Sequence, residues 1–269
     1  MVDISIVIVN YNSKDFTLNC VKSILASDWS GLSYEIIVVD NNSGDGVGEL
    51  LQSEKLAVKF IQSSENNGMG AGNNIGFKVA QGKYFVAINP DTLVATDTFK
   101  ILFDYMEKNS DVGVVAPQLL NPDKTIQNSC FRWYSLLTPV YRRLPLDKFK
   151  FAQKDIDRFL MADYDRKKMR EVDWLMGSFL FCRAEVLKKI NYFDERYFMY
   201  FEDTDLCRTF WKEGWRVVYF PEAKVIHNHA RESAEKAWYM FISSKSTRGH
   251  IYSWLKYLLK WGPGLPKSN

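Results

Sequence analysis

Residues 34–43 read YEIIVVDNNS, and this stretch decides the fold class. Four branched aliphatic residues, Ile36 to Val39, give way at once to the polar run Asp40-Asn41-Asn42-Ser43. Residues 4–12 (ISIVIVNYN) repeat the pattern, with an apolar run that ends at Asn10. Short β-branched runs of this kind are typical of strands buried on both faces of a sheet. We therefore expect an α/β protein in which both segments are central strands.

Further apolar runs and helix-like segments continue the alternation along the chain. The runs lie at 58–63, 84–89 and 112–118, and the helix-like segments at 14–27, 44–55 and 95–108. Strands that alternate with helices predict a doubly wound, mostly parallel sheet. With 269 residues, 46% of them hydrophobic, the chain is long and apolar enough to bury the core of one large domain.

Polar clusters follow three of the expected strands. They are Asn10-Tyr11-Asn12, Asp40-Asn41-Asn42-Ser43 and Asn89-Pro90-Asp91. In open α/β sheets, ligands bind outside the carboxyl ends of the strands. We therefore expect these three clusters to converge on one crevice.

The overall composition argues against several classes of protein. Lysine and arginine total 35 against 32 acidic residues, so no overall positive field favours a nucleic-acid partner. The four cysteines show no CxxC spacing, which indicates free cytosolic thiols rather than disulfides or a structural zinc site. No signal-peptide pattern precedes the first apolar run, and no apolar run reaches 18 residues. We expect a cytoplasmic protein, soluble or peripheral on the inner face of the cytoplasmic membrane.

The second half of the chain is less regular. Residues 136–171 predict only partly helical structure, and we interpret them as a variable insert on the acceptor side. Regular structure is expected again at 174–183, 202–213, 216–221 and 225–227, and helices after residue 233. In the tail, apolar residues recur at helical spacing, at Ile251, Trp254, Leu255, Leu258 and Leu259. Such a helix either packs on a core or lies on a membrane surface.

The glycine-rich segment Gly68-Met69-Gly70-Ala71-Gly72-Asn73-Asn74 matches no complete nucleotide-binding motif. A dinucleotide-binding GxGxxG would need glycine at Asn73, and a Walker loop would need Ser or Thr at Tyr84. Glycines at the start of a helix still allow the backbone N–H groups to approach a diphosphate. The alternative is an ordinary tight turn into a helix.

Acidic residues and a histidine supply the candidate chemistry. Asp40 could accept the imide N–H of a pyrimidine base or cap a turn, and Asp91 could hold a divalent cation. Glu202-Asp203-Thr204-Asp205 follows a run of aromatic residues and offers either a general base or a helix-dipole complement. His227, with His229 nearby, is either a metal ligand or structural.

The order and spacing of these motifs resemble family 2 glycosyltransferases over residues 3–230. The resemblance rests on Val9-Asn10-Tyr11-Asn12, Val38-Val39-Asp40-Asn41, Asn66 through Asn74, Asn89-Pro90-Asp91-Thr92, Gly177-Ser178, Phe193-Asp194-Glu195, Glu202-Asp203-Thr204-Asp205 and His227. The chain is similar to the rhamnosyltransferase-like branch that builds bacterial surface polysaccharides such as O-antigen. The resemblance implies a GT-A fold and an inverting transfer from a dTDP- or UDP-sugar, first of all dTDP-rhamnose, to a glycan or lipid-linked acceptor.

The resemblance also implies roles for individual residues and a division of the chain. Asp203 matches the general base, and Asn89 stands where the metal-binding DxD motif has its first Asp, which leaves Asp91 as the matching carboxylate. The resemblance assigns donor binding to Tyr11, Asp40, Asn73 or Asn74, and Asp91. It assigns the binding of Mg²⁺ or Mn²⁺ to Asp91 and His227. On the acceptor side it places Trp174, Gly177, Glu202 and Asp205, of which the last two would position the acceptor or support the helix. Residues 1–118 would form the nucleotide-sugar-binding half, 119–232 the acceptor-binding half, and 233–269 a helical tail.

Two other functions remain open from the sequence. A sugar nucleotidyltransferase would ordinarily place its glycine-rich loop after the first strand, where this chain has Asn10-Tyr11-Asn12-Ser13. A non-catalytic carbohydrate-binding protein or scaffold of the same fold would not need Asp91, Asp203 and His227 together.

Overall fold

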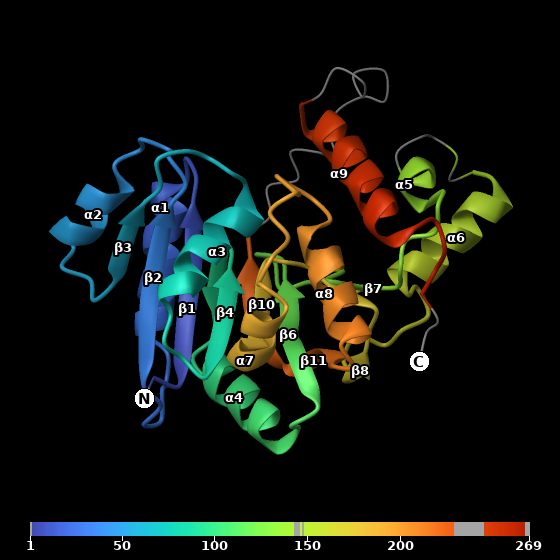
Figure 1. Ribbon diagram of the computed structural model, residues 1–269. Coiled ribbons are helices and arrows are strands. Elements are labelled where there is room, and N and C mark those ends of the chain that lie inside the picture. The colour runs from blue at the N-terminus through green and yellow to red at the C-terminus, as the bar shows by residue number, and fades with distance from the viewer. Residues whose placement is uncertain (1, 143–145, 147, 229–244, 267–269) are drawn as a thin grey trace.

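A single nine-stranded sheet forms the centre of the protein in the computed structural model, which describes residues 2–142, 146, 148–228 and 245–266 (Figure 1). The strands are ordered β3-β2-β1-β4-β10-β6-β11-β5, and β8 pairs with β11 off this path. Their bounds are β1 Ile4–Asn10, β2 Tyr34–Asp40, β3 Lys59–Gln62, β4 Tyr84–Ile88, β5 Thr92–Val94, β6 Val112–Leu120, β8 Arg170–Glu171, β10 Phe179–Arg183 and β11 Arg216–His227.

The expectation of a mostly parallel sheet is confirmed, with three exceptions in direction. Strands β3, β2, β1 and β4 pair in parallel, and so do β6 and β11. Strand β10 lies antiparallel between β4 and β6, and β5 and β8 pair antiparallel with β11. Every residue of β10 is buried, so its apolar pattern resembles that of its parallel neighbours and does not reveal its direction.

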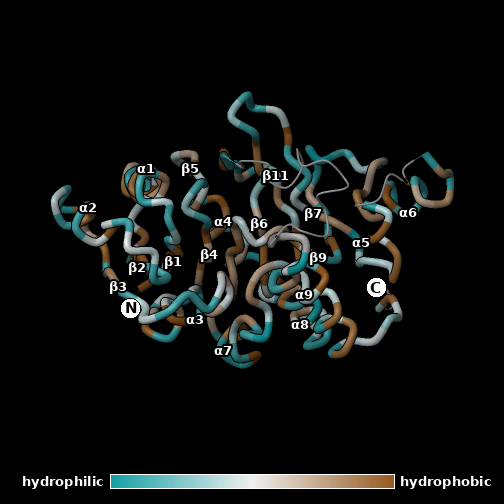
Figure 2. Tube along the Cα trace, turned by 90° about the horizontal axis from the view of Figure 1, so that it is seen from above, coloured by the Kyte–Doolittle hydropathy of each residue, from teal (hydrophilic) through white to brown (hydrophobic). Residues whose placement is uncertain are grey.

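Helices cover both faces of the sheet. Helices α1 (Lys14–Leu25), α2 (Val47–Ser53) and α4 (Thr98–Lys108) pack on one face, and α3 (Met69–Val79), α7 (Ala184–Lys189) and α8 (Glu202–Lys212) on the other (Figure 2). Alternate strand residues divide between these two cores: Ile6 and Ile8 join the first and Val7 the second. This alternation follows from the period of two along a strand.

The segment expected to be partly helical contains α5 (Thr138–Tyr141) and α6 (Lys150–Leu160). Beside them, β7 (Cys130–Phe131) and β9 (Trp174–Leu175) form a separate two-stranded sheet, so residues 174–183 are divided between two sheets rather than forming one strand. Strand β6 runs across residue 118, and β10 enters the middle of the sheet. The two expected halves of the domain therefore share one sheet.

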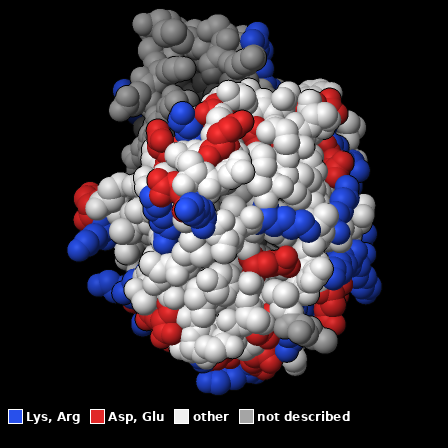
Figure 3. All heavy atoms as spheres, turned by 90° about the vertical axis from the view of Figure 1, so that its left-hand side faces the viewer, with Lys and Arg blue, Asp and Glu red and all other residues white. Residues whose placement is uncertain are grey.

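The tail forms helix α9 (Lys245–Trp261), which is drawn in red above α8 in Figure 1. Near its C-terminal end, Tyr257 and Lys260 bond to Arg208 and Asp205 of α8. Residues 233–244 and 267–269 of the expected tail, and also His229, lie outside the described residues. Among the helices that the structure describes, none is both long enough and apolar enough to cross a membrane. On the side seen in Figure 3, basic and acidic side chains are interspersed.

Candidate functional site

The carboxyl ends of β1 and β2 meet in one hydrogen-bonded cluster. Asn10 and Asp40 are register partners, and the side-chain amide of Asn10 donates to Asp40 Oδ1 at 2.7 Å. The same amide lies 3.1 Å from Asp45 Oδ2, which also accepts the backbone N–H of Lys14 at the start of α1. Tyr11 follows directly and is 51% exposed. Tyr11 and Asp40 thus stand at neighbouring strand ends, with the tyrosine ring open to solvent.

Asp40 is buried and fully hydrogen-bonded. Its Oδ1 accepts from Asn10 and the Ser43 hydroxyl, and its Oδ2 accepts from the Ser43 backbone N–H at 3.1 Å and Gln62 Nε2 at 2.8 Å. Burial raises the pKa of Asp40, but the hydrogen bonds from Ser43, Asn10 and Gln62 outweigh it, and the pKa is lowered. A carboxylate offers about four lone-pair sites, and all four are used here. The pyrimidine base of a nucleotide could therefore bond to Asp40 only by displacing one of these partners.

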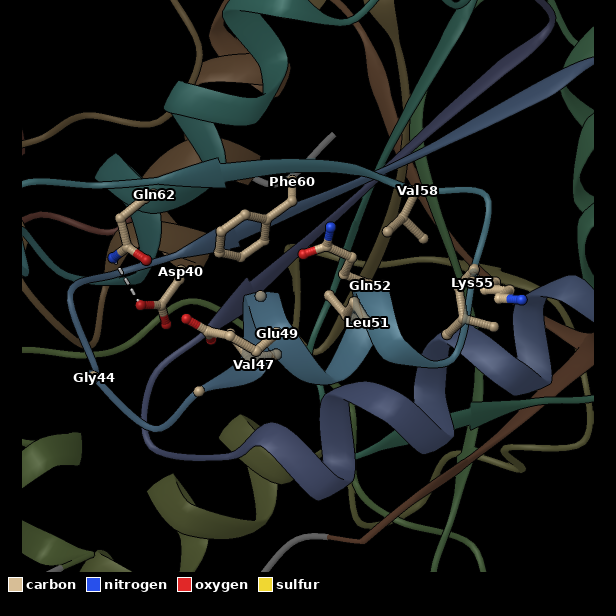
Figure 4. Close-up of a pocket in the computed structure, with 13 residues that line it drawn as sticks. Asp40, Gly44, Val47, Glu49, Leu51, Gln52, Lys55, Val58, Phe60 and Gln62 are labelled. Carbon is tan, nitrogen blue, oxygen red and sulfur yellow. Dashed lines mark hydrogen bonds between the residues drawn. The ribbon is translucent and has the colours of Figure 1, made fainter.

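A cavity of about 830 Å³ opens between α2 and β3 and reaches Asp40 (Figure 4). Figure 4 shows Asp40 and Gln62 joined at one end and Lys55 at the other. Phe60 covers Gly48, where an added Cβ would lie 2.8 Å from the phenyl ring. Gln62 is exposed on the edge strand β3 and is the Asp40 partner that can most readily move aside.

The glycine-rich segment packs against the aromatic loop 193–201. Gly68 has a φ of +91°, and a Cβ at this position would lie 1.9 Å from the Phe198 carbonyl oxygen, so only glycine fits. The Asn41 side-chain amide donates to Asn66 Oδ1 at 2.9 Å and to the Gly68 carbonyl at 3.1 Å. These contacts join the end of β2 to the loop that precedes the acidic cluster.

Asn73 and Asn74 differ in their surroundings. Asn73 is buried; its Nδ2 donates to the Met69 carbonyl, and its Oδ1 has no hydrogen-bond partner among the described residues. Asn74 Nδ2 donates to the Phe193 carbonyl at 2.9 Å and to Glu195 Oε1 at 3.0 Å, and its Oδ1 accepts the Phe193 N–H at 3.0 Å. Asn74 therefore holds the aromatic loop against α3 through both polar atoms of its side chain.

Asp203 lies at the start of α8, beside the turn between β9 and β10. Its Oδ2 accepts the Gly177 backbone N–H at 2.9 Å, and its Oδ1 accepts the Thr204 N–H at 2.7 Å. A Cβ on Gly177 would lie 3.2 Å from Asp203 Cβ and 3.3 Å from Met69 Cε, so the glycine allows these segments to meet. Burial raises the pKa of Asp203, although these hydrogen bonds oppose the effect.

Glu202 stands beside Asp203 and is buried near Gly70, whose added Cβ would lie 3.6 Å from Glu202 Cβ. Its Oε2 has no hydrogen-bond partner among the described residues. Burial, and then the charge of Asp203, raises the pKa of Glu202. Tyr200 and Phe201 both have a φ of +68°, an uncommon conformation for such side chains, and they turn the chain into α8. Backbone strain of this kind is frequent at functional sites.

Asp91 and His227 meet across the antiparallel pair β5–β11. His227 Nε2 lies 3.3 Å from Asp91 Oδ1, and His227 is 2% exposed. Asp91 is linked to the acidic cluster through the backbone: the N–H of Asn89 donates to the Ser178 carbonyl at 2.9 Å, and the adjacent Gly177 donates to Asp203. The described residues contain no group of three or more His, Cys, Asp or Glu side chains that could hold a metal.

Trp174 and Asp205 are both buried. Trp174 is buried, donates its indole N–H to the Arg132 carbonyl at 3.0 Å and stacks on Phe131. Asp205 is bonded to Lys260 Nζ at 2.7 Å, to Trp261 Nε1 at 2.6 Å and to the Tyr197 hydroxyl at 3.1 Å. Trp174 thus packs in the core, and the contacts of Asp205 match the second of its two expected roles, since they support the contact between α8 and α9.

Several residues that organise the site have no role predicted from the sequence. Asp45 and Gln62 complete the cluster around Asp40, and Gln127 contacts His227 through Oε1 at 2.9 Å from Nδ1. Asp45 follows the recognised strand-end run by two residues and could have been found there. Gln127 lies 100 residues from His227 and outside every motif, so no sequence signal marked it.

Comparisons with known proteins show the family and the fold of the chain. The sequence pattern of the family described as Glycosyl transferase family 2 matches residues 5–190. The chain is 25% identical over 257 residues to N-acetylglucosaminyl-diphospho-decaprenol L-rhamnosyltransferase of Mycobacterium tuberculosis, covering 84% of this chain and 78% of that protein. It is 26% identical over 264 residues to rhamnosyltransferase WbbL of Escherichia coli K12, covering 95% and 92%.

A solved structure shows the same fold at lower sequence identity. GalNAc-T7, crystallised with UDP, GalNAc and Mn²⁺, matches with a TM-score of 0.70 at 16% identity. The match covers 97% of this chain but 49% of that longer one. The expected GT-A fold is confirmed.

Proposed function

The chain belongs to glycosyl transferase family 2, and on that basis we propose that it transfers rhamnose from dTDP-rhamnose, with inversion, to a glycan or lipid-linked acceptor of a bacterial surface polysaccharide such as O-antigen. The main support for catalysis is the position of Asp203. The Gly177 N–H holds its carboxylate, and the adjacent Ser178 bonds to Asn89 at the end of β4. The choice of rhamnose is supported by the two rhamnosyltransferases that resemble the chain over most of its length.

Asp203 acts as the general base in this proposal. Its Oδ2 takes the proton of the acceptor hydroxyl as that oxygen attacks the anomeric carbon, and the bond to the nucleotide diphosphate breaks on the opposite face. A single displacement inverts the anomeric configuration. Because burial raises the pKa of Asp203, the carboxylate is a stronger base than an exposed aspartate. The hydrogen bonds from Gly177 and Thr204 fix its direction.

Tyr11, Asp40 and Asn73 form the donor side. The exposed Tyr11 ring is suited to stack on the base, and Asp40 is suited to accept its imide N–H after Gln62 swings away from Oδ2. Met69 and the glycines around it bring the N-terminal end of α3 close to Asp203, and the free N–H groups of a helix start favour the diphosphate.

The residues present also fit a divalent cation. Asp91 Oδ1 and His227 Nε2 lie 3.3 Å apart, and neighbouring ligands of an octahedral ion at about 2.1 Å lie about 3.0 Å from each other. Two protein ligands leave room for phosphate oxygens and water, and the mixed nitrogen and oxygen set suits Mn²⁺ at least as well as Mg²⁺. When bound, the ion would stabilise the charge that develops on the leaving diphosphate.

Helix α9 supports peripheral contact with the membrane that would carry a lipid-linked acceptor. Its Ile251, Tyr252, Leu255 and Leu259 side chains are 41%, 62%, 47% and 87% exposed. The helix contains lysines and an arginine but no acidic residue, which favours an anionic bilayer surface. We propose that this face lies on the inner leaflet of the cytoplasmic membrane.

Release of nucleotide diphosphate from a panel of dTDP- and UDP-sugars tests the proposal. The assay contains a membrane lipid extract as acceptor and Mg²⁺ or Mn²⁺, and compares the wild type with Asp203→Asn and with the exposed control Asp163→Asn. We expect release from dTDP-rhamnose, its loss with EDTA, and a decrease of about two to four orders of magnitude in Asp203→Asn alone. Binding of a donor without turnover of any donor would favour a non-catalytic scaffold instead.

A further inference from the structure

Gln127 connects the turn after β6 to the end of β11. Its Nε2 donates to Asn121 Oδ1 at 2.8 Å and to the His227 carbonyl oxygen at 2.8 Å. Its Oε1 lies 2.9 Å from His227 Nδ1. One side chain therefore holds both the backbone and the ring of the residue that faces Asp91.

The orientation of this amide is fixed by its neighbours. The His227 backbone carbonyl can only accept a hydrogen bond, so the amide atom next to it must be the NH₂ group. A chain of hydrogen-bonded side chains independently fixes the same orientation of the Gln127 amide. The Thr125 hydroxyl donates to the Asp123 carboxylate at 2.6 Å and accepts from Asn121 Nδ2 at 2.7 Å, which leaves Asn121 Oδ1 to accept from Gln127.

The protonation of the His227 ring follows from this orientation. Gln127 Oε1 has no proton to give, so the hydrogen bond at 2.9 Å requires a proton on His227 Nδ1. A neutral imidazole carries one N–H, and its Nε2 is then a lone pair. Nε2 lies 3.3 Å from Asp91 Oδ1, close to the separation of neighbouring ligands on one ion. Two electron-pair donors at this separation are suited to a shared cation.

We propose that Gln127 is a positioning residue that holds His227 in the Nδ1–H tautomer and so presents Nε2, together with Asp91, to a divalent cation. Gln127 affects turnover only if the metal-assisted transfer proposed above holds, whereas its effect on the tautomer is independent of any reaction. Outer hydrogen bonds of this kind typically change metal affinity by about 10–100-fold when removed.

Nitrogen-15 NMR of histidine-labelled, metal-free protein reads the tautomer directly. The chain has three histidines, and the His227 signals are identified by their loss in His227→Gln. The tautomer is read from the spectrum of the neutral imidazole. We expect wild-type His227 to show a protonated Nδ1 and an unprotonated Nε2. We expect Gln127→Met to lose this preference, because methionine offers no comparable acceptor.

Two further variants separate positioning from a general structural effect. Gln127→Glu keeps an acceptor opposite Nδ1 and should retain the tautomer. Gln118→Met removes a different glutamine, which is buried and donates to the Arg166 carbonyl at 2.8 Å, and should leave the His227 signals unchanged. Electron paramagnetic resonance of Mn²⁺ with UDP or dTDP then measures affinity, which should fall about 10–100-fold in Gln127→Met and much less in the other two.

The outcomes divide clearly. A wild-type His227 protonated on Nε2, or a Gln127→Met variant that keeps the Nδ1–H form, would overturn the assignment of Gln127. The expected tautomers without any Mn²⁺ binding by the wild type would overturn its metal-presenting role. The expected tautomers and Mn²⁺ affinities in a protein that turns over no donor would support Gln127 and count against the proposed transfer alone.

Discussion

Replacing Lys260 by methionine tests whether helix α9 is held to α8 by a buried ion pair. Lys260 Nζ lies 2.7 Å from Asp205 Oδ2 and 2.7 Å from Asp194 Oδ2. The Asp205 side chain is 2% exposed, Asp194 is 19% exposed, and the lysine itself is 24% exposed. Methionine preserves most of the apolar stem and removes only the charge.

The expected loss follows from these exposures. Removing one partner of a fully buried pair costs about 3–5 kcal/mol, because the remaining charge is left in the interior. Lys260 is about a quarter exposed, and Asp205 keeps its bonds to Trp261 and Tyr197, so solvent and these donors reduce the cost to about 2–3 kcal/mol. At about 2–4 °C per kcal/mol for a chain of this size, the melting temperature should fall by about 4–12 °C.

Thermal and urea unfolding followed by circular dichroism measure this loss. The control is Lys256→Met on the same helix, which loses an exposed bond to the Arg196 carbonyl and should change stability little. In the double variant Lys260→Met/Asp205→Asn, no charge is left buried, so the two losses should not add. A Lys260→Met protein that melts within about 1 °C of the wild type, or additive losses in the double variant, would refute the reasoning.

The same variant should depend on pH in a defined direction. Burial raises the pKa of Asp205 above the ordinary aspartate value, and removal of Lys260 raises it further. Between the ordinary and the raised pKa, the folded protein keeps a proton that the unfolded chain releases, so stability falls as pH rises through that window. Lys260→Met should therefore regain part of its lost stability when the pH is lowered through this window.

Gly68→Ala should lower the free energy of unfolding, measured by denaturant titration, far more than Gly214→Ala. Both glycines have positive φ, so both substitutions share a backbone cost of about 1–2 kcal/mol. Only at Gly68 would the new Cβ meet a backbone oxygen, at 1.9 Å. Equal losses would contradict this. Burial and the Asp203 charge raise the pKa of Glu202 to about 8, so the folded wild type keeps a proton that the unfolded chain releases above pH 4.5. The melting temperature of the wild type should therefore decline between pH 4.5 and about 8, and Glu202→Gln should flatten this decline. An unchanged slope in the variant would count against the raised pKa. Leu259→Ser should weaken sedimentation with anionic vesicles without changing the melting temperature, since this side chain is 87% exposed; unchanged vesicle binding would show that it does not touch the bilayer.

The strands could be predicted from the sequence because each buried strand is a short run of consecutive apolar residues. The apolar runs at 4–9, 34–40 and 84–89 became β1, β2 and β4 with ends shifted by one residue at most. The direction of β10 could not be predicted, since a strand buried on both faces has the same pattern in either orientation. Direction depends on the path of the chain between strands, which apolar periodicity does not encode.

Site residues divide according to how far away their partners lie. The recognised strand-end runs contain Asp40, at the end of β2, and Asp91, just after β4, as the local pattern predicts. The bond from Asn74 to the Phe193 carbonyl could not be predicted, because the two residues lie 119 positions apart in the sequence. The same holds for the Trp174 indole, which bonds to a carbonyl 42 residues away. A motif specifies which side chains are near a strand end, but not which of them a distant loop has already engaged.

The acidic cluster shows how helix geometry separates residues that look like one motif. Successive residues of an α-helix are about 100° apart, so Asp203 and Asp205 project about 200° from each other. Asp203 accordingly faces Gly177 at the turn between β9 and β10, while Asp205 faces Lys260 and Trp261 of α9. Helix α8 therefore joins the proposed base to the helix whose apolar side chains are exposed. If that face lies on a bilayer, the height of Asp203 above the lipid is set by the ion pair, so an acceptor anchored in the membrane would meet the base at a fixed level.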